Sequence, residues 1–328
     1  MKVLVVAPAW VGDMVMAHCL VTLLARSEGS RVDMVAPPAT APLAERMPGV
    51  TRCWTLSAGH GELALGTRRA LAAQLAAEEY DQAIVLPNSF KSALLPFWAR
   101  VPRRTGWHGE ARFVVLNDRR RLDPDRYPLM IERFMALALP PGAALPRPYP
   151  EPRLLADEDR ARALIREFGL ADAGVTILCP GAEFGPAKRW PPRHYAAVAG
   201  HEVAAGRQVW LLGSPGDAPA CAEIEALAPA GVVNLAGRTR LLDAVDLIAV
   251  ADRVICNDSG LMHVACALGT PTVAVFGSTS PDFTPPLGPR ARVVRHPVPC
   301  SPCFARECPL GHLDCLEKLE PAQVIEAL

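Results

Sequence analysis

The chain has 328 residues, of which 50% are hydrophobic, and its 34 Lys and Arg residues are balanced by 34 Asp and Glu residues. At about 150 residues per domain, this length predicts two domains, each with enough apolar side chains to fill a core. A net charge of zero excludes the broad basic field of a general nucleic-acid binder. We therefore expect no nucleic-acid partner, and any anionic ligand must be met by local charge.

The N-terminus has a short apolar run, but Pro8 and Asp13 interrupt it before a signal-peptide core or a membrane span could form. No other stretch of about 18 uncharged apolar residues follows. This pattern favours a cytoplasmic protein. In that compartment the ten cysteines should be thiols or metal ligands rather than disulfides.

In the first half, short apolar runs that end in Gly, Pro or Asn alternate with longer amphipathic stretches, which is typical of βαβ units and a parallel sheet. We predict strands at 3–8, 32–37 and 82–87, with helices near 13–26 and 63–79. The segment 140–152 holds six prolines, so it predicts a linker that closes a first domain of residues 1–150.

The same alternation resumes after the linker and predicts a second doubly wound domain, residues 151–328, with a closing helix at its end. Its expected strands are 175–181, 208–213, 232–237, 253–258 and 272–277. Such paired α/β halves bind ligands at the carboxyl ends of strands, in the cleft between the halves. Candidate site residues should therefore follow strands directly.

Asp13 follows the first expected strand after a Trp-Val-Gly turn, in the otherwise apolar or small stretch PAWVGDMVMA. A buried and unpaired Asp costs several kcal/mol, so this carboxylate needs a partner or a task. It can cap the first helix, or it can act as a general base at the wall of a cleft, with Gly12 letting a substrate approach the backbone. The two roles are compatible.

The segment CPGAEFGPAKRWP follows an expected strand and places Lys188 and Arg189 just before a helix that starts near Pro191. Cations at a helix N-terminus oppose the macrodipole unless they share an anion, so the pair indicates an anion site or else a solvated loop. In LLGSPGD, Gly213 lets backbone approach a ligand, and Asp217 either accepts from ribose hydroxyls or caps the next helix.

The stretch NDSGLMHVACALG places four turn-forming residues at a helix start, where free N–H groups of Ser259 and Gly260 form an anion site. Asp258 in the same turn would repel a phosphate, so it is better suited to hydroxyls, and a sugar attached to a phosphate satisfies both. His263 lies near the face of Ser259, or it is a core histidine. In NSFKSAL, Lys91 in the first helical turn suggests a second anion site.

Six segments together, VGDMVM, LPNSFKSALLPF, RTGWHGE, PGAEFGPAKRWP, NDSGLMHVACALG and GSTSPDFTPPL, closely resemble the bacterial ADP-heptose:lipopolysaccharide heptosyltransferases of glycosyltransferase family 9, in particular the heptosyltransferase II group. The resemblance covers nearly the whole chain up to residue 295. It implies a GT-B fold, with two Rossmann-like domains facing across a cleft. The N-terminal domain would take the acceptor and the C-terminal domain ADP-heptose.

The resemblance further implies an inverting transfer without a catalytic cofactor, from ADP-L-glycero-D-manno-heptose to the first heptose of the inner core, heptosyl-Kdo2-lipid A. Asp13 would be the base and Lys188 would contact the diphosphate. The loop around the heptose and its phosphates would comprise Asp258, Gly260, Leu261 and His263. The full donor set that we predict adds Gly12, Glu183, Arg189, Gly213, Asp217 and Ser259.

On the acceptor side we expect Asn88, Lys91, Arg103 and Arg104 to meet the phosphates and carboxylates of a Kdo-containing lipid A core. The lipid of this acceptor also suggests peripheral contact of the protein with the cytoplasmic face of the inner membrane.

Four cysteines, Cys300, Cys303, Cys308 and Cys315, have the spacing C-x2-C-x4-C-x6-C, which suits a structural Zn or a single Fe. Nothing in the expected mechanism uses that metal, so transfer should persist without it. Some related protein heptosyltransferases have a four-cysteine iron finger, so a protein acceptor or another core sugar stays an alternative. A second alternative is a non-catalytic, metal-stabilised nucleotide-sugar binding module. A nicotinamide dehydrogenase is disfavoured because neither half has a G-x-G-x-x-G after its first strand.

Overall fold

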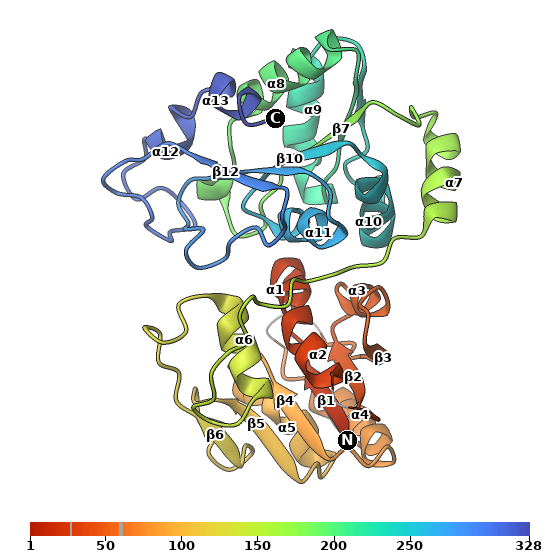
Figure 1. Cartoon of the computed structure of the whole chain (residues 1–328), viewed down its shortest axis with the longest axis vertical. Helices are drawn as coiled ribbons and strands as arrows, with labels where there is room; N and C mark the ends of the chain where they lie inside the picture. The colour runs from red at the N-terminus through yellow and green to blue at the C-terminus, as the bar shows by residue number, and fades with distance from the viewer. Residues whose placement is uncertain (27, 59–61) are drawn as a thin grey trace. The chain divides into compact units, whose positions relative to one another are not determined.

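The computed structural model describes residues 1–26, 28–58 and 62–328, and the chain divides into two compact units, Met1–Leu154 and Leu155–Leu328 (Figure 1). Each unit contains a six-stranded sheet in which every paired strand is parallel to its neighbours. The α/β class predicted from the sequence is therefore confirmed. The division falls just after the proline-rich segment 140–152.

The first unit has the strand order β3-β2-β1-β4-β5-β6. Its strands are β1 Lys2–Val6, β2 Arg31–Ala36, β3 Val50–Thr55, β4 Gln82–Val85, β5 Arg103–Trp107 and β6 Asp118–Arg120. Its helices are α1 Val11–Met16, α2 His18–Ala25, α3 Ala41–Glu45, α4 Leu65–Ala76, α5 Phe90–Trp98 and α6 Met130–Ala138.

The three strands predicted for this unit are confirmed as β1, β2 and β4, whereas β3, β5 and β6 were missed. The missed strands lie at or toward the edges of the sheet, where polar side chains replace the apolar run: β3 reads VTRCWT and β5 begins with two arginines. The helix predicted at 13–26 is divided at Ala17 into α1 and α2.

The second unit has the strand order β12-β11-β10-β7-β8-β9. Its strands are β7 Val175–Cys179, β8 Gln208–Leu211, β9 Val232–Asn234, β10 Arg253–Asn257, β11 Thr272–Phe276 and β12 Ala291–Arg295. Its helices are α7 Glu158–Phe168, η1 Pro186–Lys188, α8 Pro192–Ala204, η2 Pro215–Asp217, α9 Ala218–Leu227, α10 Leu241–Val250, α11 Gly260–Leu268, α12 Asp314–Glu317 and α13 Pro321–Ile325.

The five strands predicted for this unit are confirmed, and only the partly exposed edge strand β12 was missed. β4, β7 and β11 are buried at every residue. Helices cover both faces of a parallel sheet, so the residues of its central strands are apolar at consecutive positions. These continuous apolar runs made the central strands recognisable in the sequence. Among the described residues, no helix is long and apolar enough to cross a lipid bilayer.

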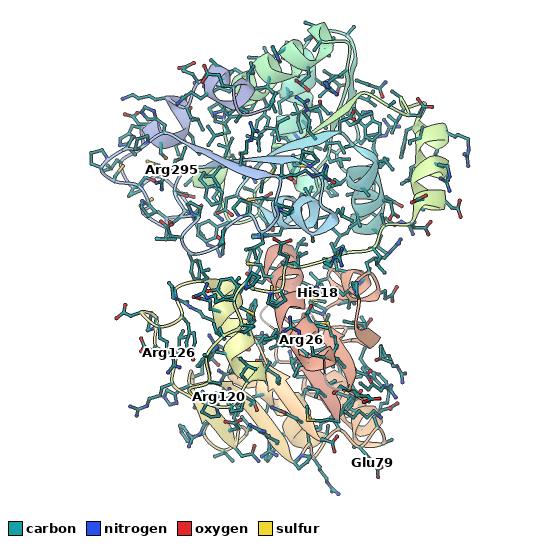
Figure 2. The ribbon with its side chains drawn as sticks, in the orientation of Figure 1. His18, Arg26, Glu79, Arg120, Arg126 and Arg295 are labelled. Atoms are coloured by element: carbon teal, nitrogen blue, oxygen red, sulfur yellow. The ribbon has the colours of Figure 1, made fainter. Side chains whose placement is uncertain are left out.

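His18, the first residue of α2, is labelled in Figure 2 and is hydrogen-bonded to the backbone near the end of the first unit. Its Nδ1 accepts the backbone N–H of Arg153 at 3.0 Å, and its Nε2 lies 2.9 Å from the carbonyl oxygen of Pro48. One ring nitrogen thus accepts and the other donates, which is the pattern of a neutral imidazole. Burial also lowers the pKa of His18, which favours the same form.

In each sheet there is a pair of neighbouring strands from which the chain continues toward opposite sides of the sheet, so the strand order reverses between them. In the first unit this junction lies between β1 and β4, and in the second it lies between β7 and β10. The crevice outside the carboxyl ends of such strands is where open α/β sheets bind ligands. The segments that follow these four strands are therefore where the candidate residues matter.

Candidate functional site

A buried ion pair joins the two loops at the β7–β10 junction. The Nζ atom of Lys188, at the end of η1, lies 2.6 Å from Oδ2 of Asp258 and 3.3 Å from the Asp258 carbonyl oxygen. The side chain of Asp258 is only 4% exposed and that of Lys188 14%. Thr279 Oγ1 donates to the same Oδ2 at 2.5 Å. Lys188 is thus part of a buried polar network, and the solvated-loop alternative does not hold for it.

Asn257, the last residue of β10, explains why these loops meet. Its Oδ1 accepts from the backbone N–H of Trp190 at 3.1 Å and from the hydroxyl of Tyr195 at 2.9 Å, while its Nδ2 donates to the Pro180 carbonyl at 2.6 Å. Asn257 is fully buried, so these bonds form in a low-dielectric interior. They fix the backbone at Pro180 and at Trp190, on either side of the loop that contains Lys188. Sequence reasoning placed Asn257 at a turn but missed this role.

The N-terminus of α11 lies directly beside the ion pair. Ser259 occupies the cap position without a side-chain capping bond, and Ser259, Gly260 and Leu261 are partly exposed. The first N–H groups of a helix lack intrahelical acceptors, so they can bind an anion. Pairing with Lys188 neutralises Asp258, which removes most of the repulsion that this carboxylate would exert on a phosphate.

His263 is buried on α11, with 5% of its surface exposed. Burial lowers its pKa to about 4, the negative charge of Asp258 acts in the opposite sense, and the positive charge of Lys188 lowers it further. The imidazole is therefore neutral near pH 7. It can donate one hydrogen bond and accept another at this site, but it cannot supply a positive charge to a phosphate.

Asp217 caps its own turn. Its Oδ2 accepts from the backbone N–H of Ser214 at 2.9 Å and from the Ser214 hydroxyl at 2.7 Å. A Cβ added at Gly181 would collide with the Asp217 carboxylate, and one added at Gly213 would lie 2.8 Å from the Asp217 Cβ. Asp217 does occupy the cap position of α9, but its side chain makes no capping bond there, so the prediction that it caps the next helix was wrong. Its carboxylate closes the preceding η2 turn instead, and both glycines make room for it.

Glu183 and Arg189 are exposed residues of the loop that follows β7. Nη2 of Arg189 donates to the Ala182 carbonyl at 3.4 Å. The structure thus places both residues on the same loop as Lys188 but does not show them bonded to the Lys188–Asp258 pair.

In the first unit, Asp13 is the third residue of α1 and is partly buried. The cap position is Trp10, so the interpretation of Asp13 as the cap residue itself was wrong. A carboxylate in the first turn still suits the positive end of the helix dipole. Asp13 and its neighbour Gly12 lie beyond the carboxyl end of β1, at the junction with β4.

Asn88 and Lys91 follow the neighbouring strand β4, so the fold brings them to the carboxyl end of the sheet, where Asp13 also lies. The guanidinium of Arg112, which is 1% exposed, donates to Asn88 Oδ1 at 3.1 Å. The backbone N–H of Phe90, at the start of α5, donates to the carboxylate of Glu110. The anion expected at this helix start is thus, in this structure, a side chain of the protein. Sequence reasoning missed Arg112, because an arginine in a polar loop gives no signal of burial.

Arg103 and Arg104 lie at the opposite end of the sheet, where the parallel strands begin. Arg103 begins β5 and pairs in register with Gln82, the first residue of β4. Its Nη2 lies 3.0 Å from Asp118 Oδ2, and Arg104 Nη1 donates to the Val101 carbonyl at 2.6 Å. These arginines hold strand ends together, so we withdraw them from the acceptor set.

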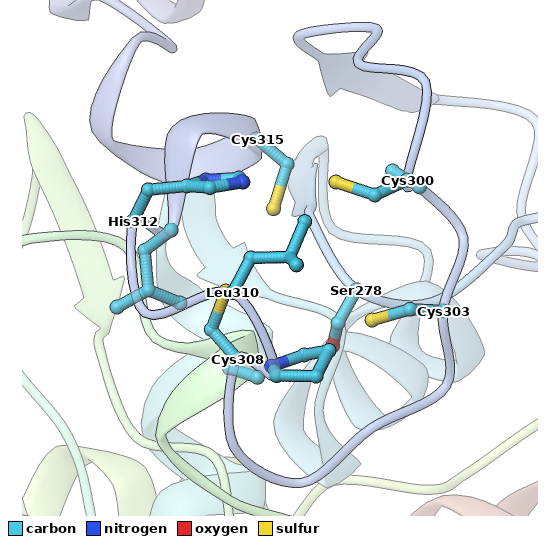
Figure 3. Close-up of a pocket in the computed structure, with 11 residues that line it drawn as sticks. Ser278, Cys300, Cys303, Cys308, Leu310, His312 and Cys315 are labelled. Atoms are coloured by element: carbon cyan, nitrogen blue, oxygen red, sulfur yellow. The ribbon is translucent and has the colours of Figure 1, made fainter.

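The side chains of Cys300, Cys303, Cys308 and Cys315 line one pocket, together with Ser278 and His312 (Figure 3). All four cysteines are free thiols. Backbone N–H groups, that of Leu313 first, lower the pKa of Cys308, whereas burial raises the pKa of Cys315. The hydroxyl of Ser278, a residue that is 2% exposed, has no hydrogen-bond partner within the described residues.

The expected metal is not shown by this arrangement. Over residues 1–26, 28–58 and 62–328, no group of three or more His, Cys, Asp or Glu side chains is placed so that it could hold a metal ion. The soft thiol donors and the unpaired Ser278 hydroxyl do suit a ligand in this pocket, but the metal stays a prediction.

The two doubly wound parallel sheets have the architecture of the GT-B class of fold, with a buried cation beside a helix N-terminus in one unit and a carboxylate beyond the central strand in the other. Comparison with known proteins then gives the family. The sequence model of glycosyltransferase family 9, described as heptosyltransferase, matches residues 68–314. The chain therefore belongs to glycosyltransferase family 9 and is a heptosyltransferase.

Relatives match over all or most of the chain. Lipopolysaccharide heptosyltransferase 2 of Salmonella typhimurium is 46% identical over 339 residues, which cover 100% of this chain and 97% of the relative. Lipooligosaccharide heptosyltransferase 2 of Haemophilus influenzae is 43% identical over 309 residues, covering 90% and 88%. The solved structure of E. coli ADP-heptose lps heptosyltransferase II superposes with a TM-score of 0.90 at 43% identity, covering 100% of this chain and 97% of that one.

Proposed function

We propose that the chain transfers a heptose from ADP-L-glycero-D-manno-heptose to the first heptose of the lipopolysaccharide inner core, heptosyl-Kdo2-lipid A. The full-length relatives named for this activity support the proposal. The observation that carries it is the buried Lys188–Asp258 pair beside the start of α11. It offers a cation and helix N–H groups for a diphosphate, next to a carboxylate for sugar hydroxyls.

For the donor, the diphosphate binds the N–H groups of Ser259 and Gly260, and Lys188 is shared between the phosphate and Asp258. Asp258 accepts hydrogen bonds from heptose hydroxyls, and neutral His263 is buried on the same helix, α11. As the bond between the anomeric carbon and ADP breaks, negative charge grows on the leaving diphosphate. Preorganised donors of this kind each supply a few kcal/mol of transition-state stabilisation.

For the acceptor, Asp13 is the general base. It takes the proton from the acceptor hydroxyl while that oxygen forms the new bond to the anomeric carbon, and ADP leaves from the opposite face with the electron pair of the broken bond, so the configuration inverts. Asn88 and Lys91 lie at the same end of the sheet and would contact polar groups of the acceptor. No step of this reaction requires a cofactor.

The Asp13→Asn variant tests this proposal with ADP-heptose, heptosyl-Kdo2-lipid A and mass measurement of the product. Loss of general-base catalysis should lower turnover by roughly 10²–10⁴-fold, while the affinity for ADP is unchanged. The exposed residue Asp125, changed to Asn, is the matched control in the same unit. A variant with more than about a tenth of wild-type turnover would exclude Asp13 as the base. A wild-type protein that binds ADP but forms no product from this acceptor would favour another core sugar or a protein as the acceptor.

A lipid-linked acceptor implies peripheral contact with the cytoplasmic face of the inner membrane, which we include in the proposal. The loop between β5 and β6 exposes Phe113 by 59% and Val114 by 68%, and Lys91 lies on the neighbouring α5. Apolar side chains beside a cation suit an anionic membrane surface. Sedimentation with anionic vesicles should recover the wild type, and Phe113→Ser should reduce that recovery. Equal recovery of both proteins would contradict this contact.

We also propose a structural metal, Zn or Fe, at the four cysteines, on the basis of their spacing and their shared pocket. Four thiolates would leave no open coordination position, so the metal would not take part in the transfer. Elemental analysis should find about one metal ion per chain, and Cys303→Ser should lose it. Protein purified without a chelator that contains no metal would refute this part.

A further inference from the structure

The loop 300–315, called the four-cysteine loop below, packs directly on the turn that ends at Lys188. The backbone N–H of Ala187 donates to the carbonyl oxygen of Arg306 at 3.0 Å. Gly185 has φ +156°, and a Cβ there would collide with the same oxygen. The backbones are therefore in direct contact, and only glycine fits between them.

The same loop holds the segment that follows β11. The backbone N–H of Phe304 donates to the Ser278 carbonyl at 2.7 Å, and the Ser301 hydroxyl donates to the Gly277 carbonyl at 2.6 Å. The next residue is Thr279, whose hydroxyl binds Asp258. One loop thus touches both segments from which the side-chain partners of Asp258 come.

Two apolar side chains of this loop are largely exposed, although the Phe304 ring also meets the ring of Phe283 edge-on. Phe304 is 49% exposed and Leu310 is 63% exposed. Phe304 and Leu313 have positive φ values of 55° and 52°, which are unfavourable for residues other than glycine by about 1 kcal/mol or more each. The hydrogen bonds to Ala187, Ser278 and Gly277 offset part of this cost, and the four thiols are the further groups that gather at the centre of the loop (Figure 3).

We propose that the four-cysteine loop is a clamp that positions Lys188 and Thr279 against Asp258, so that its cysteines set the affinity for the donor diphosphate. It acts through the backbone of Ala187 and Ser278, so the cysteines are positioning residues and not catalytic ones. The inference rests on the proposed role of Lys188. It reverses the expectation from the sequence that transfer persists when the metal of these cysteines is lost.

The test compares Cys303→Ser with Cys221→Ser, a buried thiol on α9 of the same unit. Calorimetry with ADP should show about tenfold weaker binding for Cys303→Ser, a difference of about 1.4 kcal/mol. Cys221→Ser should keep wild-type affinity even if its melting temperature falls as far, which separates positioning from general destabilisation. Equal ADP affinity for Cys303→Ser and wild type would overturn the clamp.

A second pair of variants tests the contact itself. Gly185→Ala should push the loop from the turn and weaken ADP binding, and its effect should not add to that of Cys303→Ser, because both break the same connection. Gly206→Ala is the control, since Gly206 also has positive φ but no atom within 4 Å of its added Cβ. Additive effects of the two loop variants would contradict the shared route.

Lys188→Ala distinguishes failure of the clamp from failure of the proposed function. If Lys188→Ala leaves ADP affinity unchanged, the donor site has been assigned wrongly and the clamp falls with it. If Lys188→Ala weakens ADP binding but Cys303→Ser and Gly185→Ala do not, the donor site stands and the clamp alone is refuted.

Discussion

Removal of the lysine from the Lys188–Asp258 pair should destabilise the second unit strongly. Lys188→Ala leaves a carboxylate that is 4% exposed without its cation. Truncating one partner of a buried pair costs about 3–5 kcal/mol, and we take about 3 because Thr279 still donates to Asp258. For a unit of this size, about 3 kcal/mol corresponds to a fall in melting temperature of roughly 6–12 °C.

The double variant Lys188→Ala, Asp258→Asn separates stability from binding. The amide that this variant introduces at position 258 carries no charge, so most of the lost thermal stability should return. ADP affinity should not return, because the cation that meets the diphosphate is still missing. Differential scanning calorimetry of the wild type and both variants, with titration calorimetry for ADP, gives both quantities.

Two results would refute this reasoning. A melting temperature of Lys188→Ala within about 2 °C of the wild type would show that the pair contributes little to stability. Recovery of ADP affinity in the double variant would show that Lys188 acts only by masking the charge of Asp258. In that case the helix N–H groups, and not the lysine, would hold the diphosphate.

Two further predictions concern the buried side chains of His263 and Arg112. Burial holds the pKa of His263 at about 4 in the folded chain, below its unfolded value, so this residue favours folding fully above pH 6.5 and loses up to about 3 kcal/mol as the pH falls to 4. In His263→Gln, the free energy of unfolding measured with urea should fall less between pH 6.5 and 4, whereas His201→Gln, at an exposed position, should behave as the wild type. Parallel pH profiles for wild type and His263→Gln would show that His263 does not cause this loss. Arg112→Met should raise the acceptor KM at unchanged ADP affinity because the loops beyond β4 and β5 lose their link, whereas Arg103→Ala should change neither; an acceptor KM that responds to Arg103 and not to Arg112 would restore the original acceptor set.

The sequence predicted the elements whose chemistry is local. Central strands are continuous apolar runs, so their positions were found, and the loops after them contained Lys188 and Asp258 as expected. The sequence did not reveal β5, so it did not show that Arg103 begins a strand whereas Lys91 follows one, and this decides which of them lies at the same end of the sheet as Asp13. Lys91 and Arg103 are similar in sequence context, yet they lie at opposite ends of one sheet.

Contacts between distant segments were also hidden. The bond from Thr279 to Asp258 and the contact of Arg306 with Ala187 join residues far apart in the chain, and no periodicity or motif reports them. Asn257 is similar: its type and position suggested a turn, but only the fold shows that it fixes the backbone of Pro180 and Trp190. Hydrogen bonds of this kind depend on tertiary position rather than on residue order.

The buried pair itself explains how a chain of zero net charge can receive a diphosphate. A lone buried lysine would lose its proton or remain strongly destabilising, because desolvation disfavours the charged form. Asp258 holds the Lys188 side chain in place before a ligand arrives, so little reorganisation is needed when the diphosphate binds. The same pairing prevents Asp258 from repelling the phosphates. A donor with both a sugar and a diphosphate offers a partner to each residue of the pair: hydroxyls for Asp258 and phosphate oxygens for Lys188. A phosphate without its sugar offers a partner to Lys188 alone.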